Sequence, residues 1–293
     1  MASKKPDHHE IPEYYLRGFC EPCTSFVWTF ERNRPFNPGG KRGVNNPDRR
    51  GVRKTALRPD GYKARTREGE TQYRFERELA GQEQLANSVI RKVRSFSRID
   101  FNDKSVLADY IFLTAKRLTA RDDEMLPKMR EALAEETAEC AREVLRLAEF
   151  GEFAKASQLQ RELEYWKSQD AETFFLRRTM TRQVGLVHRA LLAKPWQFVK
   201  APPEGFFVTN DNPVVFDRRL GLERATLLFP LSRNVILITN DSRGEDLVYR
   251  DATVAEVQKL NTVIIISARR EIYSPRPDEW IHKMWTKGFN FYS

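Results

Sequence analysis

Hydrophobic side chains recur at two spacings along this chain, and the changes between them divide it into three parts. Residues 1–74 combine one short helical pattern with strand-like runs, residues 75–200 carry helical spacing, and residues 201–293 return to short β-rich runs. This order predicts an α+β protein with a small β-containing N-terminal part, a central helical bundle and a C-terminal β-rich part with one long helix. We expect the three parts to form one composite domain.

The N-terminal part contains one helix, one strand and a long polar stretch. Tyr15, Leu16 and Phe19 predict a helix over residues 12–19, and the aromatic and β-branched run 26–30 predicts a strand. Residues 32–67 are rich in glycine and proline and predict an exposed loop or irregular arm, in which residues 52–57 could add a strand.

Helical spacing then continues to residue 193. A helix is predicted from Phe75, a second behind an Asn102-Asp103 cap, and an exposed helical pair over 128–148 and 152–169 that is joined at Gly151. A last helix is predicted over residues 171–193. In the C-terminal part a helix is expected over residues 252–266. The strands expected there cover residues 205–209, 213–216, 226–229, 234–239 and 271–274.

The net charge of +9 is concentrated in residues 32–67. That stretch holds twelve of the 50 Lys and Arg residues but two of the 41 acidic ones, which gives it +10 and leaves −1 for the rest of the chain. Such a segment favours contact with the phosphate backbone of a nucleic acid. Its aromatics, Phe36 and Tyr62, are too few for base stacking. A solvated loop is the alternative. The candidate nucleic-acid contacts are Lys41, Arg42, Arg49, Arg50, Arg53 and Lys54.

Composition limits the class of protein. Hydrophobic residues make up 40% and charged residues 31%, as in ordinary globular proteins, and no window approaches the roughly 18 apolar residues of a membrane helix. Three cysteines favour a reducing compartment, so we expect a cytoplasmic protein without membrane partners. Cys20 and Cys23 have the spacing of half a zinc site, but a second such pair is missing, which favours two ordinary thiols.

Two short motifs could carry chemistry. His8 and His9 stand at the start of the first helix, where histidine can act as a base or metal ligand, or merely cap the helix. Thr209 to Pro213 lies between two predicted strands, where it is a site or an ordinary turn. Arg117 lies on a helix and could clamp a phosphate if it faces inward. Walker A, GxSxG, HExxH and dinucleotide fingerprints are missing from the sequence.

These motifs resemble a known family. His9, Pro12, Tyr15-Leu16 and Phe19 are similar to the opening HxxP…YL..F motif of domain-of-unknown-function family 4238, and Thr209 to Pro213 resembles its T-S-D-N-P motif. The resemblance extends to an aromatic strand at 27–30, to helices that carry Glu83 and Arg117, to Pro230-Leu231-Ser232, and to Asn261 with Ala268. Here Asn210 replaces the usual serine, Arg233 stands where proline is common, and the two cysteines are outside the family pattern.

The resemblance implies a bacterial protein with a role in antiphage defence, and it draws attention to His9 and Asp211. We therefore expect a nucleic-acid-cleaving effector whose catalytic residues are His9, Glu83, Arg117, Asp211 and Asn212. His9 would be the general base or a metal ligand, Asp211 and Glu83 would bind Mg²⁺ or Mn²⁺ or orient water, and Arg117 would stabilise charge on the phosphoryl group. The alternative is a non-catalytic sensor or blocker that binds nucleic acid or a phage protein. In that case His9 and Asp211 pin the N-terminus to the C-terminal sheet.

Overall fold

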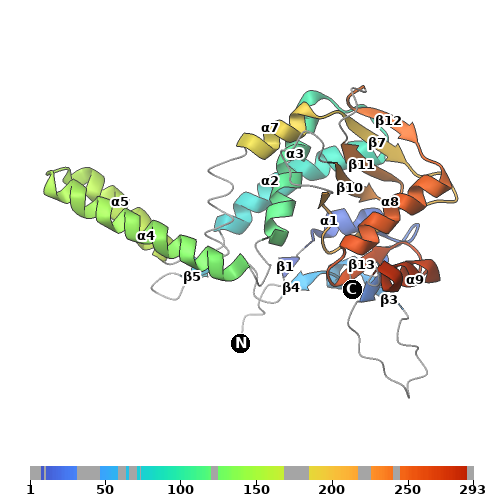
Figure 1. Ribbon diagram of the computed structural model, residues 1–293, viewed down its shortest axis with the longest axis horizontal. Coiled ribbons are helices and arrows are strands. Elements are labelled where there is room, and N and C mark those ends of the chain that lie inside the picture. Colours follow the sequence, from blue (N-terminus) through green and yellow to red (C-terminus); the bar gives the residue numbers. More distant parts are fainter. Residues whose placement is uncertain are drawn as a thin grey trace, which may run out of the picture.

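The computed structural model describes residues 8–9, 11–31, 47–58, 64–65, 71–72, 74–119, 125–167, 185–216, 226–239 and 245–288. Strands and helices follow one another as an α+β arrangement, which confirms the predicted fold class. A body of two main sheets and their helices carries a long helical hairpin that projects away from it (Figure 1).

The larger sheet has five strands in the order β12-β7-β11-β10-β9. Its pairs are antiparallel apart from β12 and β7, which run parallel. Its strands are β7 (Trp196–Lys200), β9 (Val215–Phe216), β10 (Leu227–Ser232), β11 (Val235–Thr239) and β12 (Val248–Asp251).

Both faces of this sheet are covered, which explains why β10 and β11 are apolar at nearly every position. Phe229 and Leu237 face a core shared with the helices α1, α2, α3 and α7. Leu228 and Ile236 face a second core shared with α8 and α9. The helices of the first layer are α1 (Glu13–Leu16), which continues into the 3-10 turn Arg17–Phe19, α2 (Arg74–Arg94), α3 (Phe101–Thr119) and α7 (Gly185–Ala193). Those of the second are α8 (Val254–Ser267) and α9 (Glu279–Gly288).

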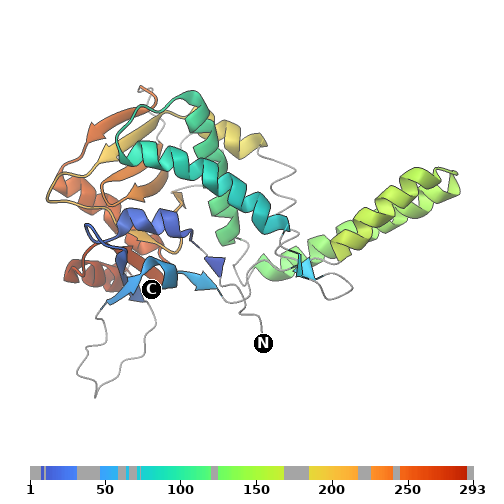
Figure 2. The ribbon, with the colours of Figure 1, turned by 180° about the vertical axis from the view of Figure 1, so that it is seen from behind.

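The second main sheet joins both ends of the chain. Its four strands lie in the order β3-β2-β13-β8, all antiparallel. They are β2 (Phe26–Glu31), β3 (Asp48–Gly51), β8 (Thr209–Asn210) and β13 (Glu271–Ser274). Figure 2 shows this sheet, in blue and red, below the larger one. Two small strand pairs complete the β structure, β1 (His8–His9) with β4 (Leu57–Arg58) and β5 (Ala64–Arg65) with β6 (Thr71–Gln72).

The hairpin consists of α4 (Met125–Glu149) and α5 (Phe153–Lys167). They pack on each other as the predicted helical pair, and the turn contains Gly151 at a φ of +75°, a conformation that glycine adopts without strain. Figures 1 and 2 both show it extending from the body.

Several sequence predictions need correction. Of residues 52–57, Leu57 alone lies in a strand, the start of β4: a 3-10 turn, Val52–Lys54, occupies most of the segment, and Thr55 closes it by donating to the Gly51 carbonyl. The cap of α3 is Asp100 rather than Asn102, because Asp100 and Asp103 each accept from the other's backbone N–H. Strands β7 and β12 and helix α9 were not predicted. Of the predicted helix 171–193, residues 171–184 lie outside the described residues.

Candidate functional site

The segments that carry the family-like motifs meet around Tyr15. Its hydroxyl lies 3.0 Å from the Thr209 Oγ1 and donates to the Pro230 carbonyl at 2.5 Å, and its ring stacks on Phe229. Tyr15 is fully buried, and this burial raises the pKa of its hydroxyl well above the ordinary value. A neutral phenol that joins β8, β10 and α1 is a structural link between motifs.

Arg94, at the end of α2, makes a second link. Its buried guanidinium donates to the carbonyls of Tyr14, Tyr15 and Leu231, at 2.8 to 3.0 Å. The carbonyls at the end of a helix lack intrahelical donors, so Arg94 satisfies α1 where its hydrogen-bond ladder stops. Gly18 permits this, because a Cβ at that position would collide with the guanidinium.

Two asparagines connect α8 to β8 and to the residues that precede β8. The buried Asn210 side chain donates to the Ile264 carbonyl and, at 2.9 Å, to the Ser267 hydroxyl, while its oxygen accepts from the Asn212 backbone. Asn261 accepts from the Val208 N–H and donates to the Phe206 carbonyl. These amides satisfy backbone groups that helix–strand packing would otherwise leave unpaired.

Asp211 follows β8 and closes the turn between α8 and β13. One carboxylate oxygen accepts from the Arg269 N–H at 2.8 Å, and the other accepts from the Arg270 N–H at 2.7 Å. Its own N–H donates to the Glu271 carbonyl. Burial raises the pKa of the Asp211 carboxyl, although the two backbone bonds lower it. Both carboxylate oxygens of Asp211 therefore accept hydrogen bonds, and these bonds act as a clasp that holds the α8–β13 turn.

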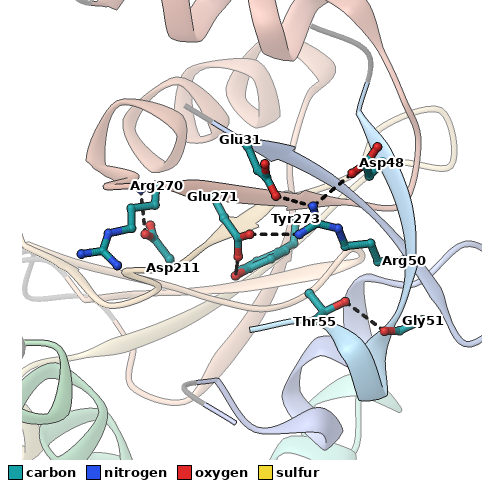
Figure 3. A network of polar contacts seen from close by, with 9 residues as sticks. All are labelled: Glu31, Asp48, Arg50, Gly51, Thr55, Asp211, Arg270, Glu271 and Tyr273. Carbon is teal, nitrogen blue, oxygen red and sulfur yellow. Dashed lines mark hydrogen bonds and ion pairs between the residues drawn. The ribbon is translucent and has the colours of Figure 1, made fainter. Parts of the chain in front are cut away.

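A charged network covers one face of the four-stranded sheet beside Asp211 (Figure 3). Glu31 and Glu271 lie opposite each other on β2 and β13, a pairing of like charges that is unfavourable alone. Arg50 on β3 resolves it by bonding Glu31, Glu271 at 3.2 Å and Asp48 at 3.0 Å. Tyr273 donates to the second oxygen of Glu271 at 2.5 Å. Glu271 thus connects Arg50 to Asp211, because its side chain accepts from Arg50 and its backbone carbonyl accepts from the Asp211 N–H.

The other basic candidates divide into two kinds. Arg49 forms a bidentate pair with Glu21, so like Arg50 it fastens β3 to its neighbours. Arg53 is 81% exposed with a loose contact of 3.6 Å to Glu13, and Lys54 is exposed. Lys41 and Arg42 lie outside the described residues.

The predicted catalytic residues occupy different parts of the molecule. Asp211 and Asn212 lie together after β8, whereas Glu83 lies on α2, on the opposite side of the five-stranded sheet from α8. His9 belongs to β1 and pairs with Leu57, and Arg117 belongs to the last turn of α3. The structure describes the backbone of His9 and Arg117 but not their side chains, so their roles stay predictions.

The part of the chain that the structure describes offers no cluster of metal ligands. No group of three or more His, Cys, Asp or Glu there could hold a metal ion. Cys20 is buried and donates to the Leu16 carbonyl, and burial raises the pKa of its thiol, whereas Cys23 is exposed.

Sequence reasoning missed several residues that the structure places in or beside these motifs. Arg94 and Glu271 gave no local signal, because a helical arginine and a strand glutamate are usually solvated, and their partners are distant in sequence. Asn210 was treated as a departure from the family pattern, but its amide supplies two donors where serine supplies one.

The fold and the motif cluster together define an α+β protein in which residues from both ends of the chain share one core. A family model described as "Protein of unknown function (DUF4238)" matches residues 7–278, and the chain belongs to this family. The comparison with curated proteins found no match, and neither did the comparison with solved structures. None of the described helices combines the length and the apolar character needed to cross a membrane.

Proposed function

We propose that this protein binds nucleic acid through its basic segment, residues 32–67, and acts in antiphage defence as a sensor or blocker. The observation that carries the proposal is the charge of that segment, +10 against −1 for the rest of the chain. Charge concentrated in this way attracts a polyanion and contacts phosphates irrespective of sequence. The defence role follows from the family resemblance.

The paired and exposed arginines support a division of labour within the segment. Arg49 and Arg50 neutralise Glu21, Glu31, Asp48 and Glu271, so they fix β3 to the sheet. Arg53 and Lys54 follow β3 and project into solvent. We therefore assign phosphate contact to Arg53 and Lys54, together with Lys41 and Arg42, and a supporting role to Arg49 and Arg50.

The geometry of Asp211 supports a protein that binds nucleic acid without cleaving it over a nuclease. A carboxylate that orients water or binds Mg²⁺ or Mn²⁺ presents an oxygen to the substrate. Both Asp211 oxygens accept backbone N–H bonds at 2.7 and 2.8 Å, and Glu271 beside it is held by Arg50 and Tyr273. A structural clasp accounts for all of these contacts.

One incubation separates binding from cleavage. Purified wild-type, His9→Ala and Asp211→Ala proteins would be mixed with labelled DNA and RNA in magnesium, manganese or chelator. Binding would be followed by the change in electrophoretic mobility of the nucleic acid, and cleavage by its length under denaturing conditions. We expect bound, full-length nucleic acid in every condition. Cleavage by the wild type that is lost in His9→Ala, with equal folding of both proteins, would contradict the non-catalytic proposal and establish a nuclease.

A further inference from the structure

Aromatic side chains gather at the end of the body away from β3, the strand within the basic segment. Tyr249 on β12 stacks on the buried Phe198 with ring centroids 5.1 Å apart, and Phe96 meets Tyr249 edge to face at 6.0 Å. The three rings lead from the core to the surface, where Phe96 is 42% exposed. Figure 1 shows β12 and β7 at the opposite end of the body from β3.

Phe96 occupies a backbone position that favours glycine. The bonds from Phe96 N–H to the Val93 carbonyl and from Ser97 N–H to the Lys92 carbonyl end α2 in a Schellman motif, and Phe96 has a φ of +55°. A side chain strains this conformation, whereas glycine does not. Helix termination therefore does not explain the phenylalanine, and strain retained at an exposed position points to a function for the ring.

Positive charge accompanies the rings. The Lys200 Nζ lies 5.1 Å from the centroid of Phe96 and 5.6 Å from that of Tyr249, and Arg98 is exposed on the same loop. Two of the nearby acids have structural roles, because Lys92 pairs with Asp103 and Asp100 caps α3, whereas the exposed Asp251 on β12 lies opposite Lys200 on β7. The Tyr249 hydroxyl donates to the Ser97 carbonyl at 2.8 Å and holds the loop in place.

Between the end of α2 and the first residue of α3, the two exposed hydrophobic side chains are both aromatic. Phe96 is joined by Phe101, the first residue of α3, which is 62% exposed, while the aliphatic Ile99 between them is buried. An apolar protein partner would be met equally well by aliphatic side chains. The partly exposed ring of Phe96, with the Lys200 ammonium over it and the exposed Arg98 on the same loop, matches the stacked bases and phosphates of an unpaired nucleic-acid strand.

We propose that Phe96, with Lys200 and Arg98, forms a stacking site for single-stranded nucleic acid. A base stacks on the exposed face of Phe96, and the two cations contact the adjoining phosphates. Paired bases in a duplex have their faces covered by their neighbours, so the site selects unpaired strands. This inference rests on the proposed function and adds the substrate class to it.

The test compares a labelled oligothymidylate strand with the same strand annealed to oligoadenylate, by fluorescence anisotropy. Phe96→Gly removes the ring and relieves the backbone strain, so the variant should be at least as stable as the wild type. We expect its affinity for the single strand to fall about 5- to 150-fold, the range for loss of one stacked base. Duplex affinity should stay unchanged.

Two further variants sharpen the result. Phe153→Ala removes another exposed phenylalanine, at the start of α5, and should leave both affinities unchanged. Lys200→Gln should reduce the slope of log affinity against log salt for the single strand by about 0.7, the value of one phosphate contact.

The outcomes separate this inference from the proposed function. Single-strand affinity that Phe96→Gly leaves unchanged, or that Phe153→Ala lowers equally, overturns the stacking site while nucleic-acid binding stands. A wild-type protein that binds the duplex but not the single strand also overturns the stacking site while nucleic-acid binding stands. A wild-type protein that binds neither probe overturns both proposals.

Discussion

Single residues in this protein connect segments that are far apart in sequence. Arg94 bonds α1 and β10, and Asp211 clasps the α8–β13 turn. Each does so by satisfying backbone groups, and a buried backbone group left unsatisfied costs about 1–3 kcal/mol. The family-like motifs therefore coincide with positions where one side chain holds several elements.

A pair of glycine substitutions tests the Arg94 link. Gly18→Ala places a methyl group against the Arg94 guanidinium and should displace it from its three carbonyls, at a cost of about 2–4 kcal/mol in the free energy of unfolding. Gly81→Ala, on the exposed surface of α2 with open space around it, should stabilise the protein by about 0.5–1 kcal/mol. Urea unfolding measures both, and equal small effects at the two positions would contradict the role of Arg94.

The pKa of Asp211 predicts a pH dependence. Burial raises this pKa above the ordinary value of 3.8, so the folded protein retains a proton that the unfolded chain has already released. This contribution to stability is complete below pH 3.8 and is lost as the pH rises through the raised pKa. The stability of the wild type relative to Asp211→Asn should therefore decrease as the pH rises from 3.8, in unfolding curves recorded at successive pH values. A difference that increases over this range would show that the pKa is lowered.

At the scale of elements, buried cations fix the helical layer to the larger sheet. The Lys104 side chain, 1% exposed, donates from α3 to the Leu192 and Lys194 carbonyls at the end of α7 and to Asp246 before β12. All three donors of its ammonium group are in use. Lys104 thus sets the position of α7 against α3 and β12.

Replacement of Lys104 by methionine tests this role. Lys104→Met keeps a linear side chain but leaves two carbonyls and one carboxylate without their donor, so we expect a loss of about 2–4 kcal/mol in unfolding free energy. Lys155→Met on the exposed hairpin should change stability by less than about 0.5 kcal/mol. If thermal unfolding shows the same midpoint for both variants, Lys104 does not hold these elements together.

The elements that the sequence predicted are those whose pattern is local. Strands β10 and β11 were recognised as β-branched and aliphatic runs, and α4 and α5 by helical spacing around Gly151. β7 was missed because it is a short run between Pro195 and Pro202, a stretch for which no element was predicted, and β12 because it is a charged edge strand. Asp211 was found through its motif, whereas the Arg50 network was not, because it forms only when β2, β3 and β13 pair.

At the scale of the whole molecule, two candidate surfaces lie at opposite ends of the body. Strand β3, the described strand pairing with β2 within the basic segment, lies at one end, and the ring of Phe96 lies beside Tyr249 of β12 at the other. The hairpin extends separately and presents Leu145, Phe150 and Phe153 near its turn. The sheet that contains β3 is formed by strands from both ends of the chain, so the placement of β3 depends on the complete fold.

Binding of nucleic acid by the basic segment can be tested through the dependence of affinity on salt concentration. Affinity for labelled DNA and RNA would be measured over a range of salt for the wild type and for a variant with Lys41, Arg42, Arg53 and Lys54 changed to Gln. A control changes Lys128, Arg130, Lys155 and Arg161 of the hairpin to Gln, which removes the same charge elsewhere. We expect log affinity to fall linearly with log salt, and we expect the first variant alone to reduce the slope, by up to about 3–4. Absence of binding at low salt, or an equal slope in the wild type and the first variant, would contradict it.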